Sequence, residues 1–385
     1  MKRWPVKPLG ELISIEKGKK APMVFAAPAN TSLRYLQIED LRPDASIKYC
    51  EPFNCPRATE SDVIIAWDGA NAGTVSCNLD GFIGSTLAIL RPVAASALSA
   101  PFLSRFLEGN FSYLQQTSTG ATIPHISKSA LMALPIPAPP LAEQERIVKL
   151  LDDADELRKL RVQADRRSAD LVPALFHEMF GDPTPNPMGW PVKSLPEVAF
   201  FQEGPGVRKW QFRSSGIKLI NVGNIVQGQL DLSNTDRYLD EDEVAKTYAH
   251  FLIDVGDLVM ATSGATWGKV AFVEPQHLPI CLNTSVVRFR PLTETTCTSV
   301  FLRAFFETKD FRRQIEQLIT GSAQPNFGPS HLKLVRLPIP PLPLQREFAH
   351  RVTEIRELEA SQAASRVHLE HLFQSMLHRA FNQAL

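Results

Sequence analysis

Two short stretches of this sequence bring potentially reactive side chains together. "GATWGKV" (264–270) holds the Gly-Lys pair of a phosphate-binding loop, but its spacing is wrong and Val270 stands where a magnesium-binding hydroxyl is needed. "HLEH" (368–371) could present two imidazoles on one helix face, yet no third ligand accompanies them. We therefore expect no nucleotide hydrolysis, no metal site and no catalytic residues, and the histidines are interpreted as solvated helix surface.

Composition favours a binding protein over a catalyst. The sequence contains neither the Asn/Asp-Pro-Pro-Tyr/Phe motif of amino methyltransferases nor the carboxylate–lysine cluster of restriction nucleases. Its 41 basic and 41 acidic residues balance, so nucleic-acid binding would have to use local patches. The five cysteines show no paired CxxC spacing, which is typical of a reduced chain. With no apolar leader at the start and no membrane-length apolar run, we expect a cytoplasmic protein.

The elements that must position the polar side chains are repeated. The matches keep one order along the chain: "WPVKPLGELISIEKG" from Trp4 with "WPVKSLPEVAFFQEG" from Trp190, "DVIIAWDGANAGTV" from Asp62 with "DLVMATSGATWGKV" from Asp257, and "TGATIPHIS" from Thr119 with "TGSAQPNFG" from Thr320. A proline-rich stretch and a helix-forming stretch follow each set. Such ordered self-similarity indicates a duplicated structural unit.

Each copy has the pattern of an α+β domain. β-Branched and apolar runs predict strands at 35–41 and 62–67 in the first copy, and at 218–225 and 257–262 in the second. The stretches "FLSRFLEGNF" and "FLRAFFETKDFRRQIEQL" carry apolar residues at helical spacing. We predict two similar globular domains, at 1–140 and 182–341.

Two long helices are predicted, at 141–181 and 342–385. Apolar residues follow a seam spacing in both helices: Ile147, Leu150, Ala154, Leu157, Ala164 and Leu171, then Phe348, Val352, Ile355, Leu358, Leu369, Leu372, Phe373 and Met376. Pro173 should kink or break the last turns of the first helix. Because the first helix leaves domain one and the second leaves domain two, we expect an antiparallel pair separating the domains, with an approximate internal two-fold. The prolines before each helix would set the angle at which it leaves its domain.

This layout resembles the specificity subunit of type I restriction–modification systems over essentially the whole chain. The resemblance is strongest in "LPIPAPPLAEQERIVKLLDDADELR" from Leu134 and "LPIPPLPLQREF" from Leu337, the entries to the two helices. The second entry departs from the Leu-Ala-Glu-Gln form but keeps Gln345 opposite Gln144.

The resemblance implies two target-recognition domains, each reading one half of a bipartite site on double-stranded DNA. It implies that the helices space the domains and dock two modification (methyltransferase) subunits, joined by restriction (motor–nuclease) subunits. No cofactor is expected on this chain, because S-adenosylmethionine would bind the modification subunit.

Under this resemblance, residues shared by both copies serve a common purpose, as core, turn or docking positions: Trp4 and Trp190, Asp62 and Asp257, Gly69 and Gly264, Gly73 and Gly268. Base readout must use positions that differ, with Arg favouring guanine, Asn or Gln favouring adenine, and Lys or Thr favouring phosphate. The DNA-binding candidates are Lys17, Lys19, Lys20, Arg34, Asp68, Asn71, Thr122, His125, Lys128, Arg208, Lys209, Arg213, Thr266, Lys269, Gln324 and Asn326. For each of them the alternative is a solvated surface side chain, and we interpret Trp67, Trp210 and Trp267 as core.

The helix starts carry the candidates for partner docking: Glu143, Gln144, Arg146, Leu150, Leu157, Gln345, Arg346, Val352 and Ile355. Two other functions stay open. The chain could be a scaffold that joins two partner copies without touching DNA, or an enzyme whose site the motifs do not reveal. Salt-dependent binding to one bipartite duplex in the presence of the modification subunit distinguishes DNA reading from scaffolding. Methyl transfer by the chain alone would indicate an enzyme.

Overall fold

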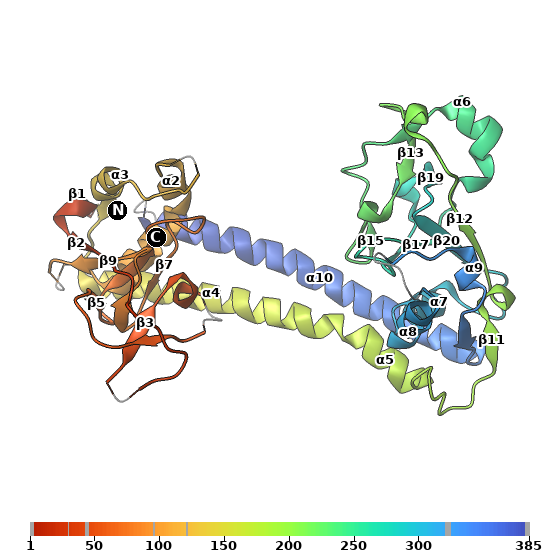
Figure 1. The fold of residues 1–385 in the computed structure, drawn as a ribbon, viewed down its shortest axis with the longest axis horizontal. Coiled ribbons are helices and arrows are strands. Elements are labelled where there is room, and N and C mark those ends of the chain that lie inside the picture. The colour runs from red at the N-terminus through yellow and green to blue at the C-terminus, as the bar shows by residue number, and fades with distance from the viewer. Residues whose placement is uncertain are drawn as a thin grey trace. The chain divides into compact units, whose positions relative to one another are not determined.

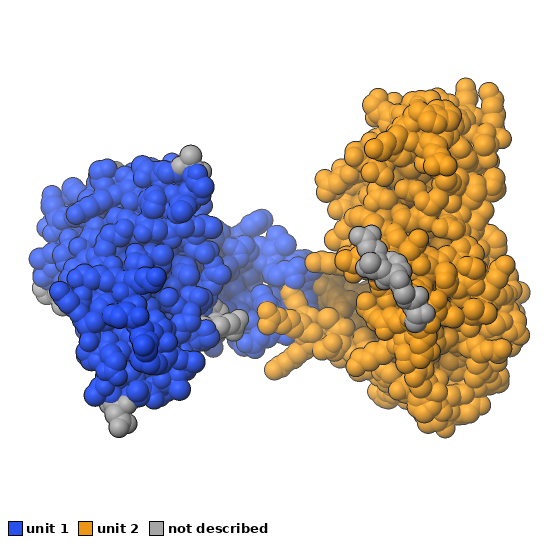
Figure 2. Space-filling view, viewed as in Figure 1, with its two compact units in different colours: residues 1–163, 362–385 blue, residues 164–361 orange. Residues whose placement is uncertain are grey.

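A computed structural model describes residues 4–29, 31–42, 46–94, 97–120, 122–319 and 325–381. The chain divides into two compact units, coloured in Figure 2: unit 1 comprises 1–163 and 362–385, and unit 2 comprises 164–361. Both units mix helices with mostly antiparallel sheet, so the predicted α+β class with two similar domains and long helices is confirmed. None of the helices within the described residues combines the length and apolarity of a membrane span.

Unit 1 contains two four-stranded sheets and a short two-stranded one (Figure 1). Its strands are β1 (Val6–Pro8), β2 (Ile13–Lys17), β3 (Leu33–Leu36), β4 (Tyr49–Cys50), β5 (Arg57–Ala58), β6 (Val63–Ala66), β7 (Val75–Cys77), β8 (Gly81–Ile83), β9 (Leu87–Pro92) and β10 (Pro135–Pro137). The sheets have the orders β2-β9-β6-β7, β4-β3-β8-β5 and β1-β10. Helices α1 (Ala100–Gly109), α2 (Phe111–Gln116) and α3 (Lys128–Ala133) complete the domain, before α4 (Leu141–Ala169) begins.

Unit 2 repeats one four-stranded sheet and the two-stranded sheet, but its second large sheet has three strands and it contains a further two-stranded sheet (Figure 1). Its strands are β11 (Val192–Ser194), β12 (Ala199–Glu203), β13 (Ile217–Ile220), β14 (Ile225–Val226), β15 (Gln229–Leu230), β16 (Tyr238–Leu239), β17 (Leu258–Ala261), β18 (Val270–Phe272), β19 (Ile280–Leu282), β20 (Val286–Pro291) and β21 (Arg336–Pro338). The order β12-β20-β17-β18 matches β2-β9-β6-β7, and β11-β21 matches β1-β10. The helices are α5 (Leu171–Phe180), α6 (Glu241–Glu243), α7 (Ser299–Phe306), α8 (Lys309–Leu318), α9 (Pro329–Leu332) and α10 (Leu342–Phe381), the last extending into unit 1.

The strands β6 and β17 explain why the sequence runs apolar without alternation. Val63 and Ile65 enter one core cluster of unit 1, whereas Ile64 and Ala66 enter another. Successive side chains of a strand point to opposite faces, so β6 is covered on both faces. The strand β17 divides its side chains between two clusters in the same way. The predicted strands at 62–67 and 257–262 are therefore confirmed.

The strands predicted at 35–41 and 218–225 are only half right. The strand β3 ends at Leu36 and is followed by one 3₁₀ turn, Ile38–Leu41. Asp40 causes this ending, because its Oδ2 accepts a 2.7 Å hydrogen bond from the backbone N–H of Gln37. Asn224 does the same after β13, where its Oδ1 accepts from the N–H of Asn221 at 2.9 Å. The helix predicted at 301–318 in unit 2 likewise divides into α7 and α8, since Thr308 caps α8 by accepting from the N–H of Phe311.

The predicted break near Pro173 is confirmed. The helix α4 ends at Ala169 and α5 starts at Leu171, which places the proline in the first turn of α5. A proline is tolerated there because the first N–H groups of a helix have no intrahelical partner. The first long helix is therefore two helices in sequence.

The helix seam is partly wrong. Ile147, Phe348, Val352 and Phe373 are buried as expected, but Leu151 takes the place predicted for Leu150. Four other predicted seam positions are exposed: Leu157 (53%), Leu171 (41%), Leu358 (49%) and Leu372 (44%). In α4 the side facing the core of unit 1 runs through positions 147 and 151, so position 157 lies off that face.

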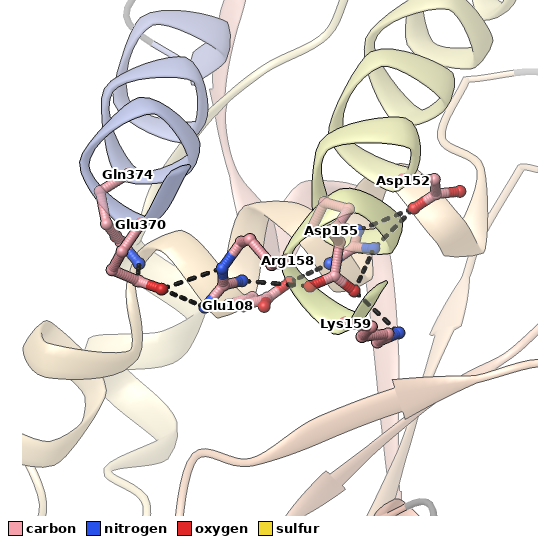
Figure 3. Close-up of polar contacts among 8 residues, drawn as sticks. Glu108, Asp152, Asp155, Arg158, Lys159, Glu370 and Gln374 are labelled. Atoms are coloured by element: carbon pink, nitrogen blue, oxygen red, sulfur yellow. Dashed lines mark hydrogen bonds and ion pairs between the residues drawn. The ribbon is translucent and has the colours of Figure 1, made fainter. Parts of the chain in front are cut away.

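Within unit 1, the start of α4 and the end of α10 pack in opposite directions. Ile147 and Leu151 share a core with Leu377 and Phe373, and further along Arg158 reaches back to Glu370. Figure 3 shows this bridge, in which Arg158 Nη2 lies 2.6 Å from Glu370 Oε2. In the same view Asp155 joins Lys159, at 2.9 Å. Within unit 2, Phe176 and Phe180 of α5 pack edge-on against Phe348 of α10.

Candidate nucleic-acid interface

The positions shared by both repeats form a structural frame. Asp62 is buried and accepts two hydrogen bonds from Arg91, at 2.9 and 3.1 Å. Asp257 is buried likewise and accepts from Arg290, at 2.7 and 3.0 Å. Burial opposes ionisation of Asp62, but the hydrogen bonds from Arg91 and Thr59 outweigh it and hold its pKa below the ordinary value. These carboxylates hold strands together and are not available to a ligand.

The paired glycines shape one hairpin turn in each unit. Gly69 and Gly73 of unit 1 have φ of 98° and 95°, and Gly264 and Gly268 of unit 2 have φ of 77° and 82°. These values lie in the left-handed region that glycine adopts without steric cost. The interpretation of the shared glycines as turn positions is therefore correct.

A second loop docks on each hairpin turn. In unit 1 the N–H of Gly69 donates to Pro124 O at 2.9 Å, and Asp68 forms an isolated bridge with His125. In unit 2 the N–H of Gly264 donates to Pro325 O at 3.1 Å, and Ser263 forms the corresponding bridge with Asn326. The two loops thus meet in the same way in both units.

Side chains at this junction differ completely between the units. In unit 1, Lys17 at the end of β2 lies 3.3 Å from Asp68, whose other oxygen lies 2.6 Å from His125 Nδ1. We call Lys17, Asp68 and His125 the unit 1 triplet. The register of β2 on β9 and of β12 on β20 places Glu203 where unit 1 has Lys17. We call Glu203, Ser263 and Asn326 the unit 2 triplet.

The unit 2 triplet has its own electrostatics. Burial raises the pKa of Glu203, whose carboxylate lies beside Gly328. Ser263 and Asn326 make no side-chain hydrogen bond with any other residue that the structure describes. The amine, carboxylate and imidazole of the unit 1 triplet are thus replaced by a carboxyl, a hydroxyl and an amide in the unit 2 triplet.

The other candidates divide between the two loops and the surface around them. Asn71 lies on the unit 1 hairpin and pairs with Arg42, while Thr122 and Lys128 are exposed on and after the docking loop. Thr266 and Lys269 are exposed on the unit 2 hairpin. Exposed positions on the loops that follow β2 and β12 hold the rest: Lys19, Lys20, Arg208, Lys209 and Arg213. Gln324 lies outside the described residues.

One candidate gains a structural role and one assignment needs correction. Arg34 pairs with the buried Asp40, with Nη2 and Oδ1 at 2.6 Å, so it holds the turn after β3 in addition to any role in readout. Trp67 and Trp267 are core residues as expected, but Trp210 is 74% exposed and the core interpretation is wrong for it. The local cause is Gln211, which turns inward in place of the ring.

The candidates for docking a partner subunit also need correction. Gln144 is fully buried, where its Oε1 accepts from Ser99 N–H and its Nε2 donates to Ala97 O, both at 2.9 Å. Gln345 makes the matching bonds to Thr298 N–H and Thr296 O, at 2.9 and 3.1 Å. These glutamines fasten each long helix to its own domain, so no partner can reach them.

Val352 is withdrawn as well, because it lies in the core of unit 2. Ile355 is partly buried against the same core. The residues that stay accessible, at least in part, are Glu143, Arg146, Leu150, Leu157, Arg346 and Ile355.

Sequence reasoning missed Glu203 and Ser263. The signal was present, because the aligned repeats place Glu203 opposite Lys17 and Ser263 opposite Asp68. Treating a differing position as a candidate in both repeats, and not only in the one with the more obvious charge, would have found them.

The family model described as "Type I restriction modification DNA specificity domain" matches residues 1–164 and 187–366. The chain belongs to this family. Among similar curated proteins, the type I restriction enzyme MjaVIII specificity subunit of Methanocaldococcus jannaschii is 27% identical over 372 residues, covering 92% of this chain and 86% of that protein. The EcoBI specificity subunit of Escherichia coli is 22% identical and covers 84% of this chain and 73% of that protein.

Solved structures agree on the fold. A chain from work on complex assembly and conformational transition of a type I R-M system matches with a TM-score of 0.68 at 19% identity, over 100% of this chain and 99% of the other. The S subunit from M. genitalium matches with a TM-score of 0.56 at 15% identity, over 98% and 96% of the two chains. The family comprises specificity subunits, which recognise DNA. Of the residues described, no three or more His, Cys, Asp or Glu are grouped so as to hold a metal ion.

Proposed function

We propose that this chain is the sequence-reading subunit of a type I restriction–modification complex, in which each unit reads one half of a bipartite DNA site. The observation that supports this most is the contrast between the triplets. The same junction of hairpin and docking loop carries Lys17, Asp68 and His125 in unit 1 but Glu203, Ser263 and Asn326 in unit 2. A duplicated frame with different hydrogen-bonding groups suits two readers of different base sequences.

Each triplet matches chemistry found on base edges. Carboxylates accept hydrogen bonds from the exocyclic amine of cytosine, lysine donates to guanine O6 and N7, and asparagine can pair with adenine. In this proposal the neighbouring exposed Lys19 and Lys20 of unit 1, and Lys269 of unit 2, hold phosphates and fix the register on the duplex.

In this proposal the long helices dock two modification subunits, one beside each unit. Leu157 on α4 and Leu358 on α10 occupy corresponding positions counted from Gln144 and Gln345, and both are about half exposed. Exposed leucines at the same place in two repeats suit two copies of one partner. The partners would bind S-adenosylmethionine and methylate adenine, and a motor–nuclease subunit would cut unmodified DNA.

The test is a binding measurement with the modification subunits co-expressed. Mapping methylated adenines in DNA from cells that express the complex gives the bipartite site, and a duplex carrying that site is then titrated at several salt concentrations. We expect tight binding that weakens steeply as salt rises. Equal affinity for a duplex with both half-sites scrambled would contradict sequence reading. Native mass spectrometry should show two modification subunits per chain, and a one-to-one complex at saturating partner would contradict the docking model.

A further inference from the structure

Trp210 is the most exposed large apolar side chain among the residues that the structure describes. It lies on a 3₁₀ turn, Lys209–Gln211, in the loop between β12 and β13, with 74% of its surface exposed. Tryptophan buries more apolar surface than other residues and is usually well covered in a folded domain. An indole that is exposed to solvent indicates a binding contact when the loop that carries it is held in place.

The loop is anchored from beneath. Gln211, the next residue, is 5% exposed, and its Oε1 accepts from the N–H of Arg208 at 2.9 Å. Its Nε2 donates to Glu243 and, at 2.9 Å, to the hydroxyl of Tyr248. After the turn, Arg213 forms a bridge with Tyr238. The backbone on both sides of Trp210 is therefore fixed, and the ring is presented outward by a rigid support.

Basic residues flank Trp210 along the chain, while Gln211 beside it contacts the carboxylate of Glu243. Arg208 and Lys209 precede Trp210, and neither has a carboxylate partner among the described residues. Arg213 directs its Nη1 to the carbonyl oxygens of Trp210 and Phe212, at 3.0 and 3.2 Å, which places a third cation at the turn without neutralising it. An exposed indole among unneutralised cations is complementary to a polyanion that also offers flat apolar surface.

The corresponding loop of unit 1 has the same character. Phe25 bridges Tyr49 beside β3, as Arg213 bridges Tyr238 beside β13. Just before this bridge Met23 is 64% exposed, and Lys19 and Lys20 are exposed on the same loop. Apolar side chains among cations at one place in both repeats indicate a shared purpose, although the residue types differ.

We propose that this loop is an apolar probe for duplex DNA, with Trp210 in unit 2 and Met23 in unit 1 packing against bases or sugars in a groove. The inference rests on the proposed DNA-reading function and adds a contact outside the triplets. The flanking cations position the loop on the phosphates, and the ring contributes contact that depends on the shape and stacking of the bases.

The experiment uses the complex with co-expressed modification subunits and a fluorescently labelled duplex that carries the methylation-mapped site. Trp210→Ala should weaken binding about 10-fold, whereas Trp210→Phe should stay within about 3-fold of the wild type. Val255→Ala is the matched control, since Val255 is an exposed apolar residue of unit 2 next to Asp254 and should have no effect. Subtracting the emission of Trp210→Phe from that of the wild type isolates Trp210, which saturating duplex should quench and shield from acrylamide.

Unchanged affinity of Trp210→Ala, with Trp210 still open to acrylamide in the DNA complex, would overturn the proposal. Shielding of Trp210 by modification subunits without DNA would also overturn it and identify a protein interface. If the wild-type complex itself fails to discriminate the mapped duplex from a scrambled one, then the proposed function fails first. A loss of DNA binding by Trp210→Ala with unchanged thermal unfolding supports the probe.

Discussion

Units 1 and 2 share a frame down to individual hydrogen bonds but differ where the frame meets solvent. The buried Asp62 and Asp257, paired with Arg91 and Arg290, occupy the same places, as do the helix-fastening glutamines Gln144 and Gln345. At the junction of hairpin and docking loop, however, the triplets have no side chain in common. The frame is thus the same in both units while the exposed side chains differ, which separates residues that fold the domain from residues that we propose recognise DNA.

Exchange of a whole domain should have the largest effect, because it should change the recognition of one half-site only. Replacing residues 1–133 with the matching segment of a relative should change one half of the mapped site and leave the other half intact, because each unit has its own cores. Mapping of methylated adenines gives the result directly. A change in both halves would mean that the units do not read separately.

Neutralising the buried carboxylate of the frame should destabilise the two units by similar amounts. We expect Asp62→Asn and Asp257→Asn each to lower the free energy of unfolding by about 2 kcal/mol, since each removes the charge that partners a buried hydrogen-bond network. Hydrogen exchange of β6 and β17 assigns each loss to its unit. Two results would contradict equivalent frames: loss of protection in the unit that was not changed, and no loss of protection in either unit.

The pair in unit 1 also predicts a pH dependence. The folded pKa of Asp62 lies below its ordinary value, near 3.9 in an unfolded chain. Its stabilisation should therefore be complete above that pH and disappear as pH falls through the lower folded value. The stability gap between the wild type and Asp62→Asn, measured by denaturant titration, should shrink on acidification. A constant gap down to the acid transition would contradict this account.

Exchanging charges between the triplets tests whether each triplet determines the bases that its unit prefers. Lys17→Glu and Glu203→Lys should each cost about 1–2 kcal/mol of binding to the mapped duplex, and each should alter the preferred base in only one half-site. Lys7→Glu is the control in unit 1, since Lys7 is exposed on β1 away from the junction. Selection from a randomised half-site measures the preference. A uniform loss over all sequences would mean that Lys17 contacts phosphate and not a base.

The smallest effect on affinity is expected from lengthening the helices. Four extra residues in each polar middle, near 163 in α4 and 362 in α10, add about 6 Å of helix, or nearly two base pairs of DNA rise. The half-site sequences should stay the same and the unread spacer between them should grow. Methylation mapping of the variant tests this, and an unchanged spacer in an active variant would show that the partner subunits set the separation.

Much of this organisation could be predicted from sequence, because it depends on local patterns. Duplication, the buried strands β6 and β17, and the break before Pro173 all follow from apolar runs and backbone chemistry. The burial of Gln144 and Gln345 could not be predicted. A glutamine on a charged helix looks solvated until the loop that supplies its partners, 97–99 or 296–298, is folded beside it.

The candidate site shows the same limit. Lys17, Asp68 and His125 were all named, but only the structure brings them from three separate segments to one junction. Trp210 was interpreted as core because tryptophans usually are, and its exposure depends on the neighbouring Gln211 taking the inward position. Long-range contacts of this kind leave little trace in the spacing of residues.

The hydrogen bonds of the two buried glutamines bear on how domains can be exchanged between relatives. Among the described residues, the hydrogen-bond partners of the Gln144 side chain are main-chain groups, Ser99 N–H, Ala97 O and Pro139 O, and Gln345 binds main-chain groups in the same pattern. Main-chain groups are present whatever side chains the domain carries. The hydrogen bonds of either glutamine can therefore be kept when a recombined gene segment introduces a domain with other side chains, whereas helix residues in the domain core, such as Ile147 and Leu151, must still fit the new domain. If the domains read DNA as proposed, such an exchange would change one half-site in a single genetic event.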